Sequence, residues 1–257
     1  MLATARHQRI LSLLRDQGTV SASELQRNLD VTAMTVWRDL KALDELGLLR
    51  RTRGGARSLE HTFGEPDFEV KKLRSLAAKA QIASLAAREF VREGDTIALE
   101  GGTTVAALIE HLPKKRISVV TNSLPVALRV RSLRPEIPVE VAGGWLSAIS
   151  GNTIGPGALR AMDKWQASVC FLGATGFDAE VGPSDPNPFE IEAKRMLASR
   201  ARRVVMLLDS SKYGVRSVGV TIHPRRLDAL VSDQRPPRSI LAMLRLHQVR
   251  FLLAGDE

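Results

Sequence analysis

Two short amphipathic patterns follow each other within residues 21–43, SASELQRNLDVTAMTVWRDLKAL, and they strongly restrict the fold of the chain. Ser21 or Ser23 can cap a helix that runs to about Leu29, because a serine hydroxyl accepts hydrogen bonds from the free N–H groups of a first turn. Thr32 can cap another helix only a few residues later. An earlier run, RHQRILSLLRDQG, also places its apolar residues at helical spacing. The sequence therefore predicts three helices around a small core, with a short turn between the last two.

The third predicted helix has one apolar face and one charged face. Its apolar stripe follows helical spacing and comprises Val36, Leu40 and Leu43. At about 100° per residue, Met34, Arg38 and Lys41 lie on the opposite face, with Trp37 at its flank. Cations on the outer face of a helix often contact only water, so this face alone does not indicate a partner.

A basic stretch follows the third helix. Residues 48–57, LLRRTRGGAR, contain no acid and four arginines, which are Arg50, Arg51, Arg53 and Arg57. The stretch can form a short hairpin whose cations reach DNA phosphates or the minor groove. The preceding helix fits a major groove about 12 Å wide, and a formal net charge of +9 favours an anionic partner. The three helices, the short turn and the basic hairpin together predict binding to double-stranded operator DNA.

Three motifs mark residues 6–56: TVWRDL from Thr35, LDELG from Leu43 and RTRGGA from Arg51. With these motifs, the segment resembles the winged helix-turn-helix domain of DeoR-type regulators nearly end to end. The resemblance implies a recognition helix from about Thr32 to Leu46 and a wing over residues 48–57.

We predict ten DNA-contacting residues from the helix faces, the basic stretch and this resemblance together. They are Ser23, Thr32, Thr35, Trp37, Arg38, Lys41, Arg50, Arg51, Arg53 and Arg57. Trp37 stands where an arginine is common in that family. It removes one cation and offers either an apolar wedge or a core contact instead.

The composition changes after the basic stretch. Residues 58–69, SLEHTFGEPDFE, mix glycine, proline and acids without periodicity, which is typical of a domain boundary. We therefore predict a DNA-binding domain over residues 1–57, a linker over 58–74 and a larger domain over 75–257. The helix-forming run VKKLRSLAAKAQIASLAAREFV either couples the two domains or is simply the first helix of the larger one.

Strand-like and helix-like runs alternate through the larger domain. The strand-like runs are TIALE, ISVVT, PVEVA, ASVCFLG, RVVMLL and DALVS. The helical runs between them are TVAALIEHL, LPVALRVRSL and FEIEAKRMLASRA. This alternation predicts an α/β domain with a largely parallel sheet, in which ligands gather at the carboxyl ends of the strands.

Small and polar residues follow several of these strands. In LEGGTTVAALIEHL, Gly101 and Gly102 allow close backbone approach, while Thr103 and Thr104 supply hydroxyl groups before a helix. Such a turn favours a phosphate group, although similar turns also serve packing. TNS, GG and LDSSKYG end three further strands, and Lys212 can reach an anion as a point charge.

The pieces EGGTT, VVTNSL, AGG, FLGATG, EIEAKR, LLDSSK and SD carry a second resemblance. Residues 75–233 resemble the DeoR-type sensor domain, which is similar in fold to ribose-5-phosphate isomerase and binds phosphorylated sugars or related metabolites. The implied effector-binding residues are Glu100, Gly101, Gly102, Thr103, Thr104, Asn122, Ser123, Gly143, Gly144 and Lys212. The family usually has aspartate at position 100, and Pro183 and Ser184 also depart from its pattern.

Catalysis and metal binding find little support in the sequence. The carboxylates near the predicted site stand in no recognisable catalytic motif, and the five histidines are dispersed without metal-ligand spacing. The single cysteine, Cys170, lies in an apolar run and is predicted to be a buried thiol. We expect no cofactor, no metal site and no enzymatic activity.

The sequence predicts a DNA-binding transcriptional regulator, more specifically a repressor of carbohydrate-metabolism genes that a phosphorylated metabolite controls. Dimers or tetramers on repeated half-sites are expected, because a single DNA-binding domain contacts only a few base pairs. The first residues lack the apolar stretch of a signal peptide, which predicts a cytoplasmic protein without a membrane partner. Two alternatives stay open: a sugar-phosphate isomerase with a DNA-binding arm, and a constitutive DNA-binding protein with a vestigial pocket.

Overall fold

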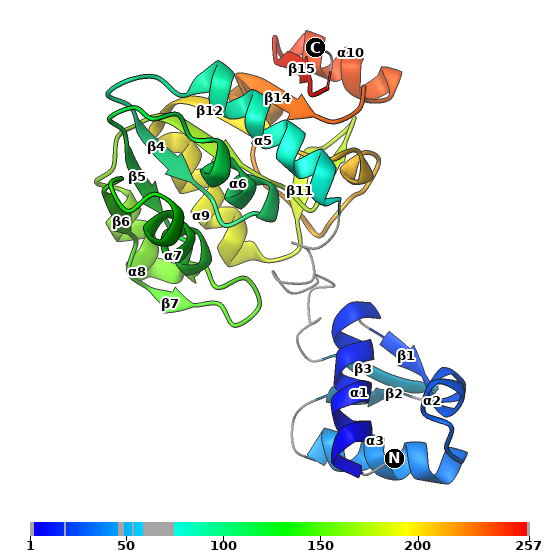
Figure 1. Cartoon of the computed structure of the whole chain (residues 1–257). Coiled ribbons are helices and arrows are strands. Elements are labelled where there is room, and N and C mark those ends of the chain that lie inside the picture. Colours follow the sequence, from blue (N-terminus) through cyan, green and yellow to red (C-terminus); the bar gives the residue numbers. More distant parts are fainter. Residues whose placement is uncertain (1–2, 18, 46–48, 53, 59–74, 256–257) are drawn as a thin grey trace. The chain divides into compact units, whose positions relative to one another are not determined.

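The structure is a computed structural model that describes residues 3–17, 19–45, 49–52, 54–58 and 75–255. The chain divides into two compact units, a first unit of Met1–Lys71 and a second unit of Lys72–Glu257. Figure 1 labels the elements of both. The predicted linker, residues 58–74, lies outside the described residues except for Ser58.

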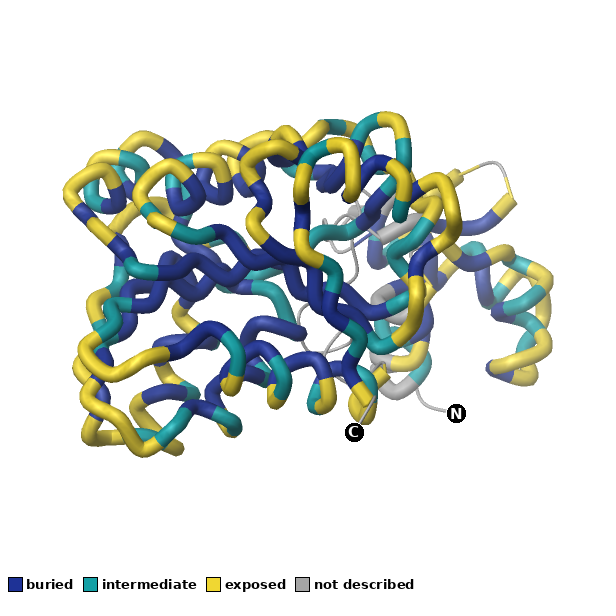
Figure 2. The backbone as a smooth tube through the Cα atoms, turned by 90° about the horizontal axis from the view of Figure 1, so that it is seen from above, coloured by how far each residue is buried: buried dark blue, intermediate teal, exposed yellow. Residues whose placement is uncertain are grey.

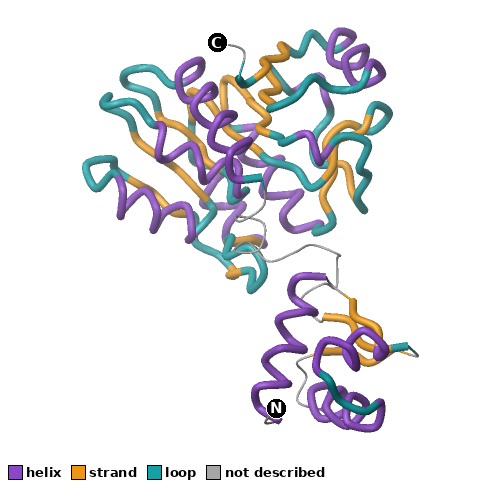
Figure 3. Tube along the Cα trace, turned by 45° about the vertical axis from the view of Figure 1, so that its right-hand side comes forward, coloured by secondary structure: helices purple, strands orange, loops and turns teal. Residues whose placement is uncertain are grey.

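The first unit is a three-helix core with a small sheet. Its elements are α1 (Ala3–Gln17), β1 (Thr19–Ser21), α2 (Ala22–Leu29), α3 (Ala33–Glu45), β2 (Leu49–Thr52) and β3 (Gly55–Ser58). Figure 3 shows the three helices beside the short strands. The predicted helices and the predicted hairpin are confirmed, with β3 reaching one residue beyond position 57.

A third strand in the first unit was not predicted. The order within its described sheet is β1-β3-β2, and Val20 pairs with Ala56 in the antiparallel register of β1 and β3. Both side chains are at most 4% exposed, so the hairpin is joined to the helical core. This pairing explains why two short strands after α3 hold their place, because an isolated hairpin is only marginally stable in water.

The second unit is an α/β domain. Its helices are α5 (Leu76–Phe90), α6 (Thr103–Ala107), α7 (Leu124–Leu133), α8 (Gly155–Met162), α9 (Pro188–Ser199) and α10 (Arg238–Leu246). Short 3₁₀ helices are η1 (Leu108–His111), η2 (Ser210–Lys212) and η3 (Pro224–Arg226). Its central strands are β4 (Thr96–Leu99), β5 (Ser118–Thr121), β6 (Val139–Val141), β9 (Ala167–Leu172), β12 (Ala201–Leu207), β14 (Ala229–Ser232) and β15 (Arg250–Leu253).

The central strands pair in the order β15-β14-β12-β9-β4-β5-β6, and every neighbouring pair is parallel. The predicted parallel sheet is therefore confirmed, and all six strand-like runs lie in it. The seventh described strand, β15, was not predicted. From β4 the chain builds outward to β5 and β6, and it then returns to add β9 on the other side of β4. The switch point of the sheet thus lies between β4 and β9, where open α/β sheets bind their ligands.

Helices cover both faces of this sheet. α5 contacts β12, β14 and α6, whereas α9 contacts β9, β12 and α8. Alternate residues along a strand point to opposite faces of the sheet. On the face of α8 and α9, Ala98 of β4 and Cys170 of β9 belong to a core cluster that also contains Met162 and Leu197. Figure 2 shows the strands as a buried layer between more exposed elements.

Two small antiparallel additions extend the second unit beyond the sheet. One is formed by β10 (Gly176–Asp178), β11 (Gly182–Asp185) and β13 (Gly219–Val220). The other is the hairpin of β7 (Trp145–Leu146) and β8 (Thr153–Ile154), called the β7–β8 hairpin below. Neither was predicted.

Candidate functional site

The connection between α2 and α3 is short and well capped. Ser21 Oγ accepts a hydrogen bond from a first-turn N–H of α2 at 3.1 Å, which settles the choice between the two predicted caps. Asp30 is the C-cap of α2, and its φ of 50° is left-handed. Thr32 Oγ1 then accepts a hydrogen bond from Thr35 N at 3.3 Å, as predicted for the start of α3. Residues 30–32 alone therefore connect the two helices.

α3 presents the two faces that the sequence predicts. Its apolar stripe is at most 1% exposed and comprises Val36, Leu40 and Leu43. On the other side, Met34 is 73% exposed, and Arg38 and Lys41 are exposed as well. Trp37 is half-buried and packs against the core of the first unit, so the core contact is the one observed of its two predicted roles. The basic face can contact a partner without disturbing that core.

The other predicted DNA-contacting residues lie on α2 and around the hairpin. They are Ser23 in α2, Arg50 and Arg51 in β2, and Arg57 in β3. Ser23 and Arg51 are exposed, and Arg51 Nε lies 3.4 Å from Asp44 Oδ2. Arg53 lies outside the described residues.

Asp39 is a buried structural residue of α3 that sequence reasoning missed. It is 4% exposed, and its carboxylate accepts hydrogen bonds from Arg6 Nε at 2.7 Å and from His7 Nε2 at 3.0 Å. Burial alone raises the pKa of Asp39, but the hydrogen bonds from Arg6 and His7 outweigh it and hold this pKa below its ordinary value. The bonds join α1 to α3, so they fix how the basic face is held on the core.

We expect the first unit of the Asp39→Asn variant to be less stable than the parent at pH 7. The pKa of Asp39 is lower in the folded chain than in the unfolded one, so its contribution is present above the unfolded pKa of about 4. The contribution is lost as pH falls through the folded pKa, and the two proteins should then converge. Urea titrations at pH 7 and pH 3, followed through the NMR signal of the Trp37 indole, measure both differences. An equal gap at both pH values would contradict this account.

Glu100 links the two turns at the switch point of the second unit. It follows β4 and is 3% exposed. Its Oε2 accepts hydrogen bonds from Gly102 N at 3.0 Å and from Gly173 N at 3.1 Å. Burial raises the pKa of Glu100, an effect that Lys194 opposes and Asp185 reinforces. The N–H of Gly102, predicted to cradle a phosphate, therefore holds an internal carboxylate here.

Lys194 of α9 lies at the centre of a buried ion-pair cluster that sequence reasoning also missed. Its Nζ donates to Asp185 Oδ2 at 2.8 Å and to Gly173 O at 3.0 Å, and it lies 3.6 Å from Glu100 Oε1. Asp185 also accepts a hydrogen bond from Thr221 Oγ1 at 2.8 Å. The motif EIEAKR contains Lys194, and it was the only signal for this residue in the sequence.

Most polar groups of the turn after β5 form hydrogen bonds within the protein. Ser123 Oγ accepts a hydrogen bond from Val126 N at 3.4 Å, which caps α7. Ser123 N donates to Thr121 Oγ1 at 3.0 Å, and Asn122 Nδ2 donates to Thr153 O at 3.2 Å. Only Asn122 Oδ1 is left, as a buried oxygen without a hydrogen-bond partner among the described residues.

The remaining predicted effector residues lie in turns along the same edge of the sheet. Thr103 and Thr104 begin α6, and Thr104 is 7% exposed. Gly143 and Gly144 follow β6 and are exposed, whereas Lys212 ends η2, after β12, and is half-buried. The strand order makes the turns after β4 and β5 neighbours and places those after β6 and β12 on either side.

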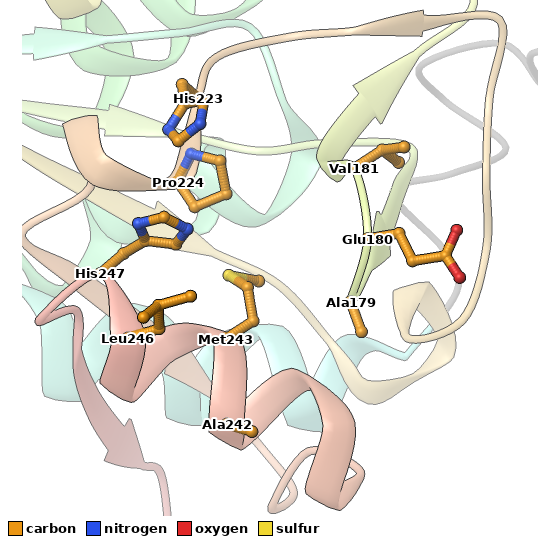
Figure 4. Close-up of a pocket in the computed structure, with 9 residues that line it drawn as sticks. All are labelled: Ala179, Glu180, Val181, His223, Pro224, Ala242, Met243, Leu246 and His247. Carbon is orange, nitrogen blue, oxygen red and sulfur yellow. The ribbon is translucent and has the colours of Figure 1, made fainter.

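A cavity of about 400 Å³ lies elsewhere in the second unit (Figure 4). It is lined by Ala179, Glu180, Val181, His223, Pro224, Ala242, Met243, Leu246 and His247. The rings of His223 and His247 meet edge to face with centroids 5.1 Å apart, and the carboxylate of Glu180 points away from them. None of the predicted effector residues lines this cavity.

Within the described residues, no group of three or more His, Cys, Asp or Glu side chains is placed to hold a metal ion. Cys170 is fully buried, as predicted, and burial raises the pKa of its thiol. No helix among the described residues has both the length and the apolar character that a membrane span requires.

Both units match known protein domains. Residues 6–62 match the DeoR-like helix-turn-helix domain, and residues 74–234 match the DeoR C terminal sensor domain. The matched segments contain α3 with its basic face and the switch point with Glu100, respectively.

Relatives align along nearly the whole chain. The lactose phosphotransferase system repressor of Streptococcus mutans is 36% identical over 231 residues, which cover 89% of this chain and 91% of the relative. The glycerol-3-phosphate regulon repressor of Escherichia coli is 29% identical over 254 residues, which cover 98% and 100%. A solved structure of ribose 5 phosphate isomerase A from Neisseria gonorrhoeae aligns over 55% of this chain and 54% of its own, at 22% identity and a TM-score of 0.40.

Proposed function

Because the chain belongs to the DeoR family of transcriptional regulators, we propose that it represses carbohydrate-metabolism genes and leaves its operator when a phosphorylated sugar or related metabolite binds. The helix-turn-helix domain implies DNA binding, and the sensor domain implies a small-molecule effector. The observation that carries the proposal is the pairing of an exposed basic helix face in one unit with a polar sheet edge in the other. We place its action in the cytoplasm.

The geometry of α3 supports its role as the recognition helix. Arg38 and Lys41 are exposed on the face away from the core, and the connection from α2 to α3 is short and capped by Thr32. Arg38 can donate two parallel hydrogen bonds to a guanine edge, which is a common base contact in the major groove. The arginines of β2 and β3 then supply contacts to phosphates. Dimers or tetramers are the expected active form on paired half-sites.

The switch point supports an anionic effector. Two backbone N–H groups, those of Gly102 and Gly173, already hold the Glu100 carboxylate there, so an effector phosphate binds to other donors of the same edge. Thr103 and Lys212 add a hydroxyl group and a cation along the same edge of the sheet. An effector changes DNA affinity only if it binds the DNA-free and DNA-bound states unequally.

A fluorescence anisotropy titration tests the proposal directly. The protein is titrated against DNA from upstream of its own gene at fixed salt, with and without a panel of sugar phosphates. Sequence-specific binding that one panel member weakens supports a repressor released by that effector. Specific binding that no member changes favours the constitutive alternative with a vestigial pocket. Binding that depends only on salt contradicts the proposed operator recognition.

We expect the Lys212→Ala variant to bind the operator like the parent but to need on the order of tenfold more effector for half-maximal release. Loss of one charge-assisted hydrogen bond to a phosphate has an effect of this size. The same titration measures both values. A variant that responds to the effector like the parent would show that Lys212 lies outside the site.

The alternative of a sugar-phosphate isomerase with a DNA-binding arm finds no support from the relatives, which are transcriptional regulators rather than enzymes. In the second unit, the carboxylate of Glu100 is held by two N–H groups and lies beside Lys194. These contacts suit a binding site whose carboxylates are fixed in place.

A further inference from the structure

Two buried asparagines beside the turns after β4 and β5 each leave one amide oxygen unused. Asn122 is 1% exposed and Asn152 is 2% exposed. Asn122 Nδ2 donates to Thr153 O at 3.2 Å, and Asn152 Nδ2 donates to Glu190 Oε2 at 2.9 Å. Because a carbonyl and an ionised carboxylate only accept hydrogen bonds, each amide must point its nitrogen toward these partners. Both Oδ1 atoms are buried without a hydrogen-bond partner among the described residues.

Both asparagines lie at the carboxyl edge of the sheet where the effector is proposed to bind. A Cβ built on Gly101 would lie 1.8 Å from Asn152 Oδ1, so this oxygen sits directly against the turn after β4. Asn152 also forms a β-bridge with Ser123, the residue that follows Asn122. Asn122, after β5, and Asn152, in the β7–β8 hairpin, are therefore close neighbours across the Ser123–Asn152 bridge.

The chemistry of this pair is that of a receptor for hydrogen-bond donors. A buried acceptor without a donor is costly, and native structures rarely retain one without a reason. Two carboxylates belong to the same surroundings: Glu190 holds Asn152, and Glu100, which precedes Gly101, is paired with Lys194. Such surroundings favour a ligand hydroxyl group and disfavour a second anion, because an anion would bring one more acceptor to a place that already has several.

The β7–β8 hairpin carries Asn152 and is hydrogen-bonded to Asn122, because Asn122 Nδ2 donates to Thr153 O and Thr153 Oγ1 donates to Asn122 O. Ser150 Oγ and Asn152 Nδ2 tie it to Glu190 of α9. The rings of Trp145 and Phe189 meet edge to face with centroids 6.3 Å apart, yet they are 64% and 44% exposed. An effector that reaches Asn122 and Asn152 must move the hairpin, and its hydroxyl groups then replace hydrogen bonds that the hairpin makes to Asn122 and Glu190.

We propose that Asn152, together with Asn122, accepts hydrogen bonds from hydroxyl groups of the effector and thereby selects its class. The preferred ligand is a polyhydroxylated phosphate, and its deoxy and carboxylate-bearing analogues bind more weakly. This role rests on the proposed effector site and adds a residue that binds the sugar hydroxyl groups rather than the phosphate. Sequence reasoning missed Asn152 because it lies in an irregular stretch without periodicity.

Calorimetric titration of the full-length protein with matched ligands tests this selection. The probes are glucose 6-phosphate with 2-deoxyglucose 6-phosphate and 6-phosphogluconate, ribose 5-phosphate with 2-deoxyribose 5-phosphate, and inorganic phosphate. We expect the parent to prefer the hydroxylated member of a pair by about tenfold, and Asn152→Ala to reduce that preference to about twofold or less. Asn187→Ala is the matched control, because Asn187 Oδ1 is already used by Phe189 N at 3.0 Å to cap α9. It should keep the parent preference.

The outcomes separate this inference from the proposed function. If the parent binds no sugar phosphate, the proposed effector site fails and this inference fails with it. If the parent binds a sugar phosphate but Asn152→Ala keeps the full preference, the site stands and the role of Asn152 is overturned. If Asn152→Ala does not fold, the parent alone decides, since equal affinity for the hydroxylated and deoxy ligands overturns hydroxyl reading.

Discussion

Replacing Lys194 with alanine will lower the free energy of unfolding of the second unit by about 3–5 kcal/mol. The Lys194 ammonium group lies 2.8 Å from Asp185 Oδ2 and 3.6 Å from Glu100 Oε1, and all three side chains are at most 6% exposed. Without it, two carboxylates stay buried with no cation to offset their loss of hydration. Hydrogen exchange of the amides in β9 and β12 measures the change, because strands in the middle of a sheet exchange mainly through opening of the whole unit.

A lysine on the surface of the same unit provides the control for this variant. Lys164 is exposed, and Lys164→Ala should change the free energy of unfolding by no more than about 0.5 kcal/mol. If Lys194→Ala exchanges as slowly as Lys164→Ala, the buried cluster does not stabilise the sheet in the way its geometry indicates.

The Arg38→Ala variant will bind the operator more weakly by about 1–3 kcal/mol, as expected for loss of a contact to a base edge. Arg38 is exposed on α3, opposite the buried Val36 and Leu40, so its removal should leave the fold of the first unit intact. Fluorescence anisotropy at one fixed salt concentration gives the change in affinity. The salt must be fixed because every lost cation also weakens binding to phosphates.

An arginine of the second unit separates base contact from the general effect of charge. Arg131 is exposed on α7, and Arg131→Ala removes the same charge far from α3 in the sequence. It should leave operator affinity close to that of the parent. Equal affinities of Arg38→Ala and the parent would mean that other residues read the bases.

The elements that sequence reasoning predicted well are those with local signals. The cap at Thr32 and the apolar stripe of Val36, Leu40 and Leu43 are set within one helix, and both are found in the structure. The buried strands β4, β5 and β9 are likewise apolar runs bounded by turn residues. Such signals depend on neighbours a few residues away, which a single sequence displays in full.

The missed strands depend on partners that are distant in the sequence. β1 has only three residues, and what makes it a strand is its pairing with β3, which begins at Gly55. β15 is short and partly exposed, and it is a strand because β14 offers it a free edge. Strand identity of this kind comes from tertiary context rather than from propensity.

The candidate site shows the same division. The position of Lys212 after a strand predicts a site residue, whereas the sequence around Lys194 indicates only a charged residue on an amphipathic helix. Burial of Lys194 follows only when β11 brings Asp185 beside it and the turn after β4 brings Glu100. Likewise, the pattern EGGTT predicts a turn that offers N–H groups, but it does not reveal that Glu100 already occupies one of them.

The two hydrophobic cores have consequences for how the chain melts. Among the described residues, the buried apolar side chains of the first unit lie between Ile10 and Ala56, those of the second lie between Ile82 and Ala254, and the core clusters of the two units share no residue. Unfolding is cooperative within a core, so heating should disrupt the two units in separate transitions, and the chain as a whole has no single melting temperature. A molecule that binds one unit raises mainly the transition of that unit. The transition whose midpoint temperature rises most therefore identifies the unit to which the molecule has bound.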